Sequence, residues 1–568
     1  MRIARRQPVA AVLCLLLLGA ACSGGGGGSK SESGSSSSKG STAGNDIVPT
    51  DRADLADGGK LTWPIDTFPS NFNLNELDGA LADGASVMGA LMPGMFNIDP
   101  SATPVVNTDF ASSAVLTATS PKQIVTYKLN PKATWDDGTP ITVADFQAQW
   151  KALNGQNHDF LVASTNGYEN IESVAKGADD KEIVVTFAKP FVDWQGLFSP
   201  LYPASTNKDP KTFNEGWKAK ALTTAGPFRM TNVDTTAQTI TLARNEKWWG
   251  RPSKLDTIIF RKIDRDAQAD ALANGEIDFM GIGSDVNRLK RAQDINGIKI
   301  HHSSAPNFNH MTLNGTSPIL SDLNVRKALA QSIDRDAVAK NLLGPLGVKA
   351  VPLGNHIYMT NQKGYVDNST ELPFDLAAAG KLLDDAGWKM AGDTRMKDGK
   401  PLLLHLPLPP GSNVGKLISQ LVQSMAQKVG IKVDIQSVPG DQFFPEYVSK
   451  GNFDIVLFGW SGTPFPVTSA KSIYAAPKKN ADGSEDFQQN YFRLGTPQID
   501  KLFDDAAAEF DRDKQAVLGN QIDKLIWDEV HSLTFYQVPD IVASKAKLAN
   551  FGSFGFASVI YEDIGYKK

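Results

Sequence analysis

The chain has 568 residues, and Cys14 and Cys22 are its two cysteines. Because the rest of the chain has none, a disulfide-stapled fold, a thiolate metal site and a cysteine nucleophile are excluded from the body of the protein. The net charge of −5 indicates no basic face for nucleic acid, and a hydrophobic share of 41% is ample for a core. The composition predicts a large globular protein of several domains or lobes.

The amino terminus has the pattern of a secretory signal peptide. Arginines near the start precede the uncharged run 9–21, which is shorter than the roughly 20 apolar residues of a membrane-spanning helix. The segment 18–22 resembles a bacterial lipobox, although Gly19 stands where that pattern usually has leucine. We predict a signal peptide at 1–21 and lipid attachment to Cys22. The alternative is cleavage at the same point and free secretion.

The stretch 22–46 begins with the predicted lipidation site and is otherwise rich in glycine and serine. Such a composition has little to bury and behaves as a flexible coil. We predict a tether that holds the folded part away from a membrane surface.

The folded part has the patterns of a mixed α and β protein. Apolar residues with a period of two, or in one unbroken run, predict strands at 125–129, 183–187, 431–436 and 453–458, the last buried on both faces. Helical stripes predict helices at 375–386, 417–429 and 500–530. Since helix and strand alternate in the second half, we expect an α/β lobe there.

The segment 129–146 combines a strand end, a turn and a helix start. Asp137-Gly138 is a turn dipeptide, and Thr142 with Asp145 forms a capping box before an apolar helix. By itself, this local pattern predicts only a surface turn followed by a helix. As a string, the segment resembles the signature of the family-5 solute-binding proteins of ABC importers, which bind peptides or nickel outside the cytoplasm.

Further strings resemble the same family in the same order. They are Gly-Pro-Phe at 226–228, Asn-Glu-Lys-Trp-Trp at 245–249, Gly-Glu-Ile-Asp at 275–278, Leu-Asn at 313–314, the helix Asp-Leu-Asn-Val-Arg-Lys-Ala-Leu at 322–329, and Phe-Asp-Ile with Gly-Trp at 453–460. Each string alone is a weak signal. Together they extend the resemblance over the folded part of the chain.

The resemblance implies an α/β, two-lobed periplasmic-binding-protein-like fold of type II with an extra subdomain and a ligand cleft between the lobes. The lobes would close about a hinge. The expected divisions are lobe I at 47–85, 203–305 and 533–568, an inserted subdomain of lobe I at 86–202, and lobe II at 306–532.

The implied function is capture of a solute, with a peptide or peptide-like compound expected, and its delivery to an ABC permease in the membrane. We expect a monomer anchored to the outer face of the cell membrane through Cys22, with no nucleic-acid partner. A non-transporting envelope scaffold or regulator that keeps the fold is the alternative function.

The predicted ligand-binding residues follow the family's late Gly-Trp motif or match its other ligand-facing positions. They are Asn73, Asn314, Trp460, Ser461, Gly462, Thr463, Phe465, Asn490 and Tyr491. Peptide-binding relatives often carry an aspartate for the peptide's amino group where this chain has Thr463. Because an unpaired buried ammonium is costly, this difference counts against a free peptide as the ligand.

The sequence motifs give little support for an enzyme or for a cofactor-binding protein. The chain has no Gly-x-Ser-x-Gly elbow and no Gly-x-x-x-x-Gly-Lys-Ser/Thr loop. His301-His302 is the best metal candidate, but no His-Glu-x-x-His motif accompanies it. We predict no catalytic residue, metal or cofactor, and we leave open a secreted hydrolase with paired carboxylates across a groove.

Overall fold

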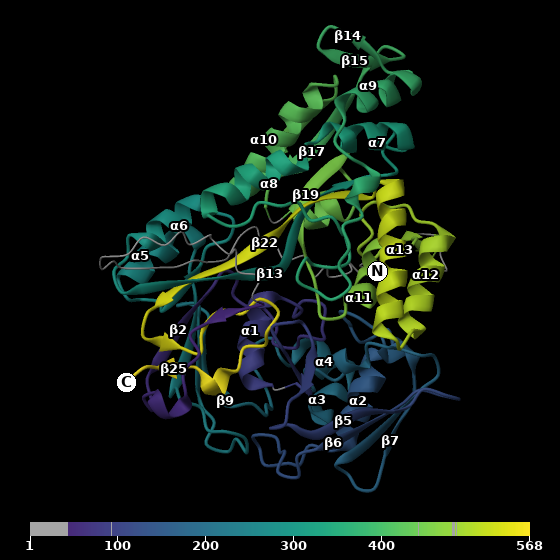
Figure 1. The fold of residues 1–568 in the computed structure, drawn as a ribbon. Helices are drawn as coiled ribbons and strands as arrows, with labels where there is room; N and C mark the ends of the chain where they lie inside the picture. The colour runs from purple at the N-terminus through teal and green to yellow at the C-terminus, as the bar shows by residue number, and fades with distance from the viewer. Residues whose placement is uncertain (1–43, 93, 441, 480–482, 484) are drawn as a thin grey trace, which may run out of the picture.

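The computed structural model describes residues 44–568 except 93, 441, 480–482 and 484. The signal peptide, Cys22 and nearly all of the predicted tether lie outside the described residues. Figure 1 shows two bodies, one above the other, with the long strands β13 (Ile298–Leu313) and β22 (Ser532–Lys545) at their boundary. We keep the names lobe I and lobe II for the ranges given above, whose exact bounds stay a prediction.

Lobe I contains two four-stranded sheets. The first has the order β2-β11-β10-β9, in which β2 and β11 are parallel and the other pairs antiparallel. Its strands are β2 (Lys60–Ile65), β9 (Phe228–Asp234), β10 (Thr239–Arg244) and β11 (Thr257–Lys262). The second sheet belongs to the inserted subdomain and has the antiparallel order β5-β6-β8-β7. Its strands are β5 (Ala111–Ala118), β6 (Ile124–Leu129), β7 (Ile171–Lys176) and β8 (Glu182–Phe187).

Helices and short strand pairs complete lobe I. Helices that pack with these two sheets are α1 (Ala82–Leu91), α2 (Val143–Leu153), α3 (Ala204–Asn207) and α4 (Pro210–Glu215), and two further helices of lobe I precede β13. The short pairs are β1 (Asp46–Ile47) with β24 (Gly552–Ser553), β3 (Phe96–Ile98) with β4 (Pro104–Val106), and β23 (Leu548–Ala549) with β25 (Gly565–Tyr566). The pair β1–β24 joins the start of the described chain to its carboxyl-terminal segment.

The capping box predicted before α2 is confirmed. The side chain of Thr142 accepts a hydrogen bond from the Ala144 amide, and the carboxylate of Asp145 accepts one from the Thr142 amide at 2.8 Å. The second oxygen of Asp145 accepts from the Ala204 amide at 2.8 Å and so ties α2 to α3. Burial raises the pKa of Asp145.

A third four-stranded sheet, with the order β12-β22-β13-β19, crosses the boundary of the lobes. Its other strands are β12 (Phe279–Gly281) and β19 (Ile455–Ser461), and α5 (Gln268–Ala273) and α6 (Val286–Gln293) precede β13. Pairing of β13 with β22 is antiparallel but shifts register between Ser304 and Phe308. A bulge of this kind interrupts the regular main-chain ladder and bends the strand locally.

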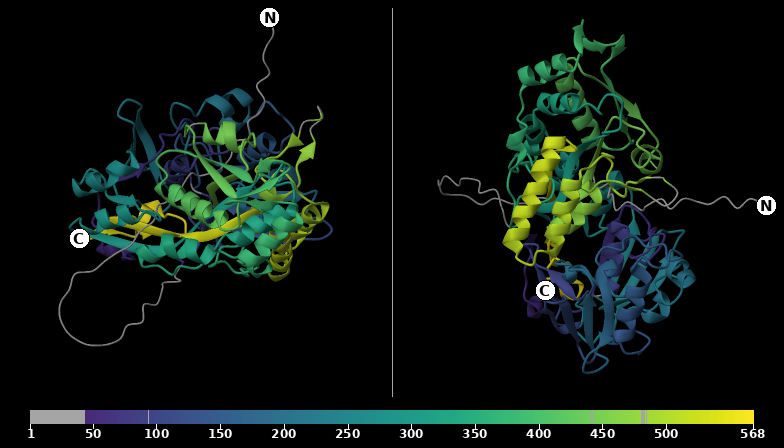
Figure 2. Two further views of the ribbon diagram at one scale, coloured as in Figure 1. Left: turned by 90° about the horizontal axis from the view of Figure 1, so that it is seen from above. Right: turned by 90° about the vertical axis from the view of Figure 1, so that its right-hand side faces the viewer.

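Lobe II is an α/β body with a projecting hairpin, as Figures 1 and 2 show. Its helices are α7 (Leu323–Ser332), α8 (Arg335–Leu343), α9 (Leu376–Asp385), α10 (Asn413–Gln427), α11 (Pro466–Tyr474), α12 (Pro497–Ala508) and α13 (Arg512–Glu529). Its strands are β14 (Lys389–Ala391), β15 (Thr394–Lys397), β16 (Lys400–Pro401), β17 (Leu403–Leu408), β18 (Lys432–Ser437), β20 (Lys478–Lys479) and β21 (Glu485–Asp486).

The four predicted strands and two of the three predicted helices are confirmed, with ends that differ by a few residues. The unit β17–α10–β18 has parallel strands joined by the predicted helix. The prediction of one helix over 500–530 is wrong, because the structure has two. Asp511 separates them, since its side chain accepts hydrogen bonds from the amides of Asp513 and Lys514 and so begins α13.

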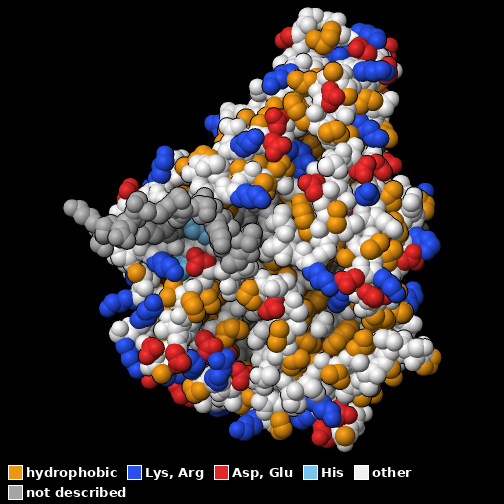
Figure 3. All heavy atoms as spheres, viewed as in Figure 1, with side chains coloured by type: hydrophobic (Ala, Val, Ile, Leu, Met, Phe, Trp, Pro, Cys, Tyr) orange, Lys and Arg blue, Asp and Glu red, His pale blue; other side chains and the backbone are white. Residues whose placement is uncertain are grey.

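Two large clusters of buried side chains form the main cores. One draws on residues 61–260, Phe279 and the carboxyl-terminal stretch 548–564. The other draws on residues 269–457, Phe492 and the stretch 530–543. The surface over these cores carries acidic and basic side chains interspersed on the face shown in Figure 3.

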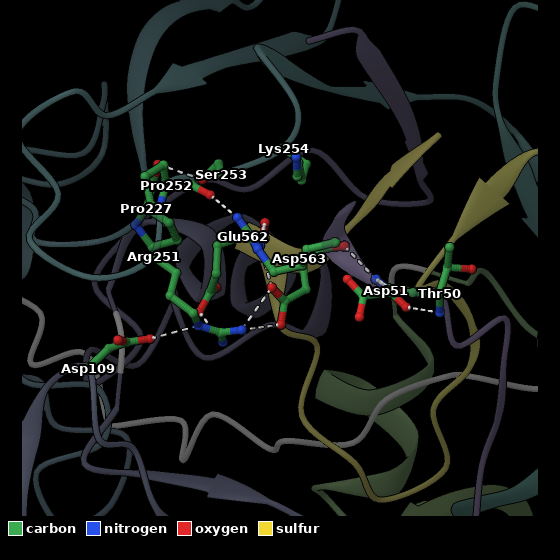
Figure 4. A network of polar contacts seen from close by, with 12 residues as sticks. Thr50, Asp51, Asp109, Pro227, Arg251, Pro252, Ser253, Lys254, Glu562 and Asp563 are labelled. Atoms are coloured by element: carbon green, nitrogen blue, oxygen red, sulfur yellow. Dashed lines mark hydrogen bonds and ion pairs between the residues drawn. The ribbon is translucent and has the colours of Figure 1, made fainter. Parts of the chain in front are cut away.

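A polar network joins four distant segments of lobe I (Figure 4). The guanidinium of Arg251 lies 3.7 Å from Asp109, 3.4 Å from Glu562 and 2.9 Å from Asp563. Arg52 pairs with Asp563 and donates to the Glu562 carbonyl at 2.7 Å. Burial raises the pKa of Glu562 to about 7, and the neighbouring carboxylate of Asp563 adds to the shift. The network holds the carboxyl terminus against the start of the folded chain.

Candidate functional site

The segment predicted to face the ligand begins on β19, at the edge of the crossing sheet. β19 pairs with β13 on one side, and β17 lies along the start of its other side, where the Asp454 amide donates to the His405 carbonyl at 3.1 Å. Beyond Ser461, the Gly462 amide donates to the Pro306 carbonyl at 2.6 Å, and Thr463 accepts from the Phe465 amide at 3.0 Å. The sheet thus carries the segment to the point where the two lobes meet.

Aromatic rings stack at this point. The rings of Trp460 and Tyr491 lie 6.0 Å apart between centroids with an interplanar angle of 4°. On the same sheet, the imidazole of His310 lies 5.9 Å from Trp460 at 18°, and Phe458 meets Trp460 edge-on at 5.1 Å. Burial lowers the pKa of His310 to about 3, so the ring is neutral at physiological pH. The stack is therefore uncharged.

Lobe I covers this stack. Ala102 of the inserted subdomain and Phe556 near the carboxyl terminus belong to the same buried cluster as Phe308, Trp460 and Tyr491. Both site aromatics are consequently buried rather than exposed. The lobes are in contact over the predicted ligand site, which is a closed arrangement.

A small cavity remains beside the stack. Its lining residues are Thr312, Trp460, Ile473, Tyr474, Gln489, Tyr491, Phe492, His531 and Ser532, and its volume is about 10 Å³. That is about the size of one water molecule. Within the described part of the chain, neither ring nitrogen of His531 has a hydrogen-bond partner, and burial lowers its pKa well below the ordinary value. Any ligand larger than a water molecule therefore needs the lobes to separate before it can reach the aromatic rings.

A second contact between the lobes lies at the end of the same segment. A carbon atom added to Gly196 of the inserted subdomain would lie 2.9 Å from the ring of Phe465, so the two residues pack tightly. Nearby, the buried carboxylate of Asp193 accepts hydrogen bonds from Thr468 and Arg512 of lobe II. The segment predicted to face the ligand is thus next to a carboxylate, but one that comes from a distant part of the chain and is already paired.

The structure brings together most of the predicted site residues. Trp460, Ser461, Gly462, Thr463 and Phe465 follow one another along one segment, and Tyr491 joins them through its stack on Trp460. The carbonyl of Thr463 also accepts a hydrogen bond from Gln362 at 2.8 Å.

The three predicted asparagines hold main chain instead. The amide group of Asn73 donates to the Phe213 carbonyl at 2.9 Å, and that of Asn314 donates to two carbonyls in the loop before β19 at 3.0 Å each. Asn490 donates to the Ala475 and Leu494 carbonyls at 2.7 Å each. No described contact directs these amides toward a ligand, and their role in binding stays a prediction.

Four residues at the site were not predicted from the sequence: Asp193, His310, Gln362 and Arg512. Asp193 and Arg512 meet only because the inserted subdomain folds against lobe II, and no local pattern marks either of them. His310 sits in a strand of mixed composition. Its place beside Trp460 follows from the pairing of β13 with β19, in which His310 is opposite Phe458.

The described residues contain no group of three or more His, Cys, Asp or Glu side chains arranged to hold a metal ion. His301 lies against Ser544 at 3.0 Å and near Asp46 at 3.6 Å. Among the described helices, none is long and apolar enough to cross a membrane.

Fold and site define an extracellular solute-binding protein. Residues 106–482, more than half of the chain, match the family described as bacterial extracellular solute-binding proteins, family 5 Middle. The chain belongs to this family, and it is a binding protein rather than an enzyme.

Individual relatives cover nearly the whole chain. The oligopeptide-binding protein OppA of Mycobacterium tuberculosis H37Rv is 39% identical over 528 residues, covering 92% of this chain and 87% of that protein. The structure of the periplasmic EDTA-binding protein EppA has a TM-score of 0.84 and 28% identity, over 92% of this chain and 98% of the other. The structure of AppA from Bacillus subtilis in complex with a nonapeptide has a TM-score of 0.76 and 20% identity, over 90% and 100%. The last likeness is one of fold alone.

Proposed function

We propose that the chain is the substrate-binding lipoprotein of an ABC importer and that its solute is an oligopeptide. The observation that carries this proposal is the 39% identity to the oligopeptide-binding protein OppA over 92% of the chain. One feature of the site supports it: an uncharged aromatic stack at the end of β19.

The end of β19 could hold a peptide without recognising its sequence. β13 pairs with one side of β19 and β17 lies along the start of the other side, so the main-chain groups near the end of β19 and in the segment after it are the candidates for peptide binding. An extended peptide can bind to a strand through main-chain hydrogen bonds. Because those bonds involve no side chain of the ligand, they give affinity with little selectivity. The flat rings of Trp460 and Tyr491 next to the strand end would contact ligand side chains once the lobes separate.

The charge of the site bears on which part of a peptide is recognised. The segment 459–466 contains no acidic residue, and both oxygens of the adjacent Asp193 are engaged by Thr468 and Arg512. A peptide ammonium buried here would lack a carboxylate partner, which is unfavourable. We propose that binding depends on the peptide main chain and apolar side chains, and not on a free amino terminus.

We also propose the anchoring and partners that the sequence predicts. Cys22 would carry a lipid, and the stretch 22–46 would tether lobe I to the outer face of the membrane, where a permease takes up the solute. The described chain begins against β24 of lobe I, which fits a tether on that lobe. A Cys22→Ala variant should lose the mass of the lipid and leave the membrane fraction. Unchanged mass and retention would contradict the anchor.

A non-transporting scaffold is the second candidate function. The observation in its favour is that Trp460 and Tyr491 are buried in one cluster with side chains of both lobes. A scaffold would keep this closed arrangement permanently, whereas a transport protein must open.

Calorimetric titration tests the proposal. Mature protein freed of ligand by reversible unfolding would be titrated with one oligopeptide in its free and N-acetylated forms. We expect both forms to bind, with dissociation constants that agree within about threefold. A preference of tenfold or more for the free form, about 1.4 kcal/mol, would overturn the proposed mode of binding. Failure of a varied set of peptides to bind would overturn the proposed function and favour the scaffold.

A further inference from the structure

Asp193 is a lobe I residue whose side chain is satisfied by lobe II. It lies between β8 and the loop that carries Trp194, in the inserted subdomain, and is 2% exposed. One carboxylate oxygen accepts a hydrogen bond from the hydroxyl of Thr468, near the start of α11. The other accepts one from the guanidinium of Arg512, the first residue of α13. Neither partner is in the same lobe as the carboxylate.

Main-chain contacts accompany the ion pair. The amide of Val192 donates to the carbonyl of Ala507, at the end of α12, at 3.0 Å. The guanidinium of Arg512 also reaches the Val192 carbonyl at 3.4 Å. Two consecutive residues of lobe I thus contact three helices of lobe II. In Figures 1 and 2 these helices, α11 to α13, stand directly over the inserted subdomain.

Hydrogen bonds within lobe II fix the position of Arg512 for this contact. Gln515 accepts from Arg512 at 2.8 Å and donates to the Ala506 carbonyl at 3.1 Å, which fixes the guanidinium relative to α12. The contact is also adjacent to the ligand-facing segment, because Phe465 packs on Gly196 and Thr468 follows three residues later in the chain.

We infer that Asp193, Thr468 and Arg512 form a latch that holds the two lobes closed, and that Asp193 is the positioning residue of this closure. When the lobes separate, the carboxylate returns to water, and when they meet it is buried and gains two hydrogen bonds. The Arg512 side chain stays 42% exposed in the closed form, so the buried group of the pair is Asp193. Removing Arg512 is costly because it leaves this carboxylate buried without its counter-charge, and removing the charge of Asp193 takes the attraction between the lobes away.

The strength of the latch would therefore set the ratio of closed to open molecules in the absence of ligand. A stronger latch raises this ratio and so lowers access of the ligand to the site. With a weaker latch, the lobes close mainly when a ligand binds and stabilises the closed form. The effect on closure is independent of the solute, while any effect on peptide affinity rests on the proposed function.

Single-molecule energy transfer between the lobes tests the latch. Dyes would be placed at Val115→Cys on β5 and Val517→Cys on α13, both on exposed side chains, in the full mature chain with Cys22→Ser. In the absence of ligand, Asp193→Asn should lower the ratio of closed to open molecules by about tenfold, as expected for one interfacial charge pair. Arg512→Met should act in the same direction, and the double variant should fall no further than the more affected single variant.

The pair Lys524–Glu371 provides the matched control, because it is an ion pair of 3.1 Å with both ends in lobe II. Glu371→Gln should leave the ratio of closed to open molecules unchanged. A wild-type distance distribution in both Asp193→Asn and Arg512→Met would overturn the latch, as would independent, additive effects in the double variant. Because no ligand is present, a failure to bind peptide would overturn the proposed function and leave this test intact.

Discussion

The rings of Trp460 and Tyr491 are almost parallel, with an interplanar angle of 4° and centroids 6.0 Å apart. One ring comes from the end of β19 and the other from the loop before α12. The stack joins the sheet that crosses both lobes to the helical part of lobe II, directly beneath the residues of lobe I that close over it. Its integrity is therefore expected to matter for both stability and ligand binding.

Truncating Trp460 should destabilise the protein. We expect Trp460→Ala to lower the free energy of unfolding of the cooperative unit that contains lobe II by about 3–5 kcal/mol, because a large buried ring is lost without collapse of its surroundings. Trp460→Phe keeps a ring in place and should cost less than half as much. Urea denaturation followed by circular dichroism measures both. Equal midpoints for the two variants would show that the ring does not pack as described.

Adding one methyl group to Gly462 should disturb the ligand-facing segment. A Cβ there would lie 2.8 Å from the carbonyl oxygen of Pro306 and 3.2 Å from Met359, so the main chain has to shift. We expect Gly462→Ala to cost about 1–3 kcal/mol of stability and to weaken ligand binding. Gly344→Ala is the control, because no described atom lies within 4 Å of the position that its Cβ would take. A neutral Gly462→Ala in thermal denaturation would contradict the tight approach.

The buried pair His356–Asp523 should be a major determinant of lobe II stability. The imidazole and the carboxylate are 2.8 Å apart and fully buried, and the same carboxylate accepts from Asn368 at 2.7 Å. Asp523→Ala should therefore cost about 3–5 kcal/mol. The exposed pair between Asp513 and Lys363, at 2.6 Å, is the comparison, and Asp513→Ala should cost under about 1 kcal/mol. Similar losses for the two variants in chemical denaturation would refute this ranking.

The pH dependence of stability should contain a contribution from Glu562. Its pKa is about 7 in the folded protein, above the ordinary value, chiefly because of burial. Between about pH 4.5 and 7 the folded state holds a proton that the unfolded chain has lost, so the free energy of unfolding falls as the pH rises. In Glu562→Gln, the decrease in the free energy of unfolding between these pH values should be smaller by up to about 3 kcal/mol. Unfolding curves at about pH 5 and about pH 8, on either side of the folded-state pKa, measure it, and an unchanged difference between the two would contradict the assignment.

Local patterns predicted much of the fold. The capping box at Thr142, the strand 431–436 and the helix before it all depend on neighbours within a few residues, and the structure has each of them. The helix expected over 500–530 divides at Asp511, where an N-cap residue was present in the sequence but outweighed by the continuous apolar pattern. The family resemblance, rather than periodicity, placed the ligand-facing segment at 459–466.

The remaining features of the site depend on contacts between distant segments. Nothing near Asp193 in the sequence indicates that Arg512 and Thr468 will surround it, because the contact exists only once both lobes have folded and met. The asparagines at positions 73, 314 and 490 illustrate the converse. Their amides donate to main-chain carbonyls in the structure, and these contacts could not be predicted from the sequence.

The most direct test of the account is the identification of what the protein carries. The mature chain would be purified under native conditions, its bound molecules released by acid, and the released material analysed by mass spectrometry, with Trp460→Ala as the comparison. The account predicts a mixture of peptides of varied sequence, in smaller amount from the variant. Release of no peptide, together with no thermal stabilisation by any member of a varied peptide library, would contradict it.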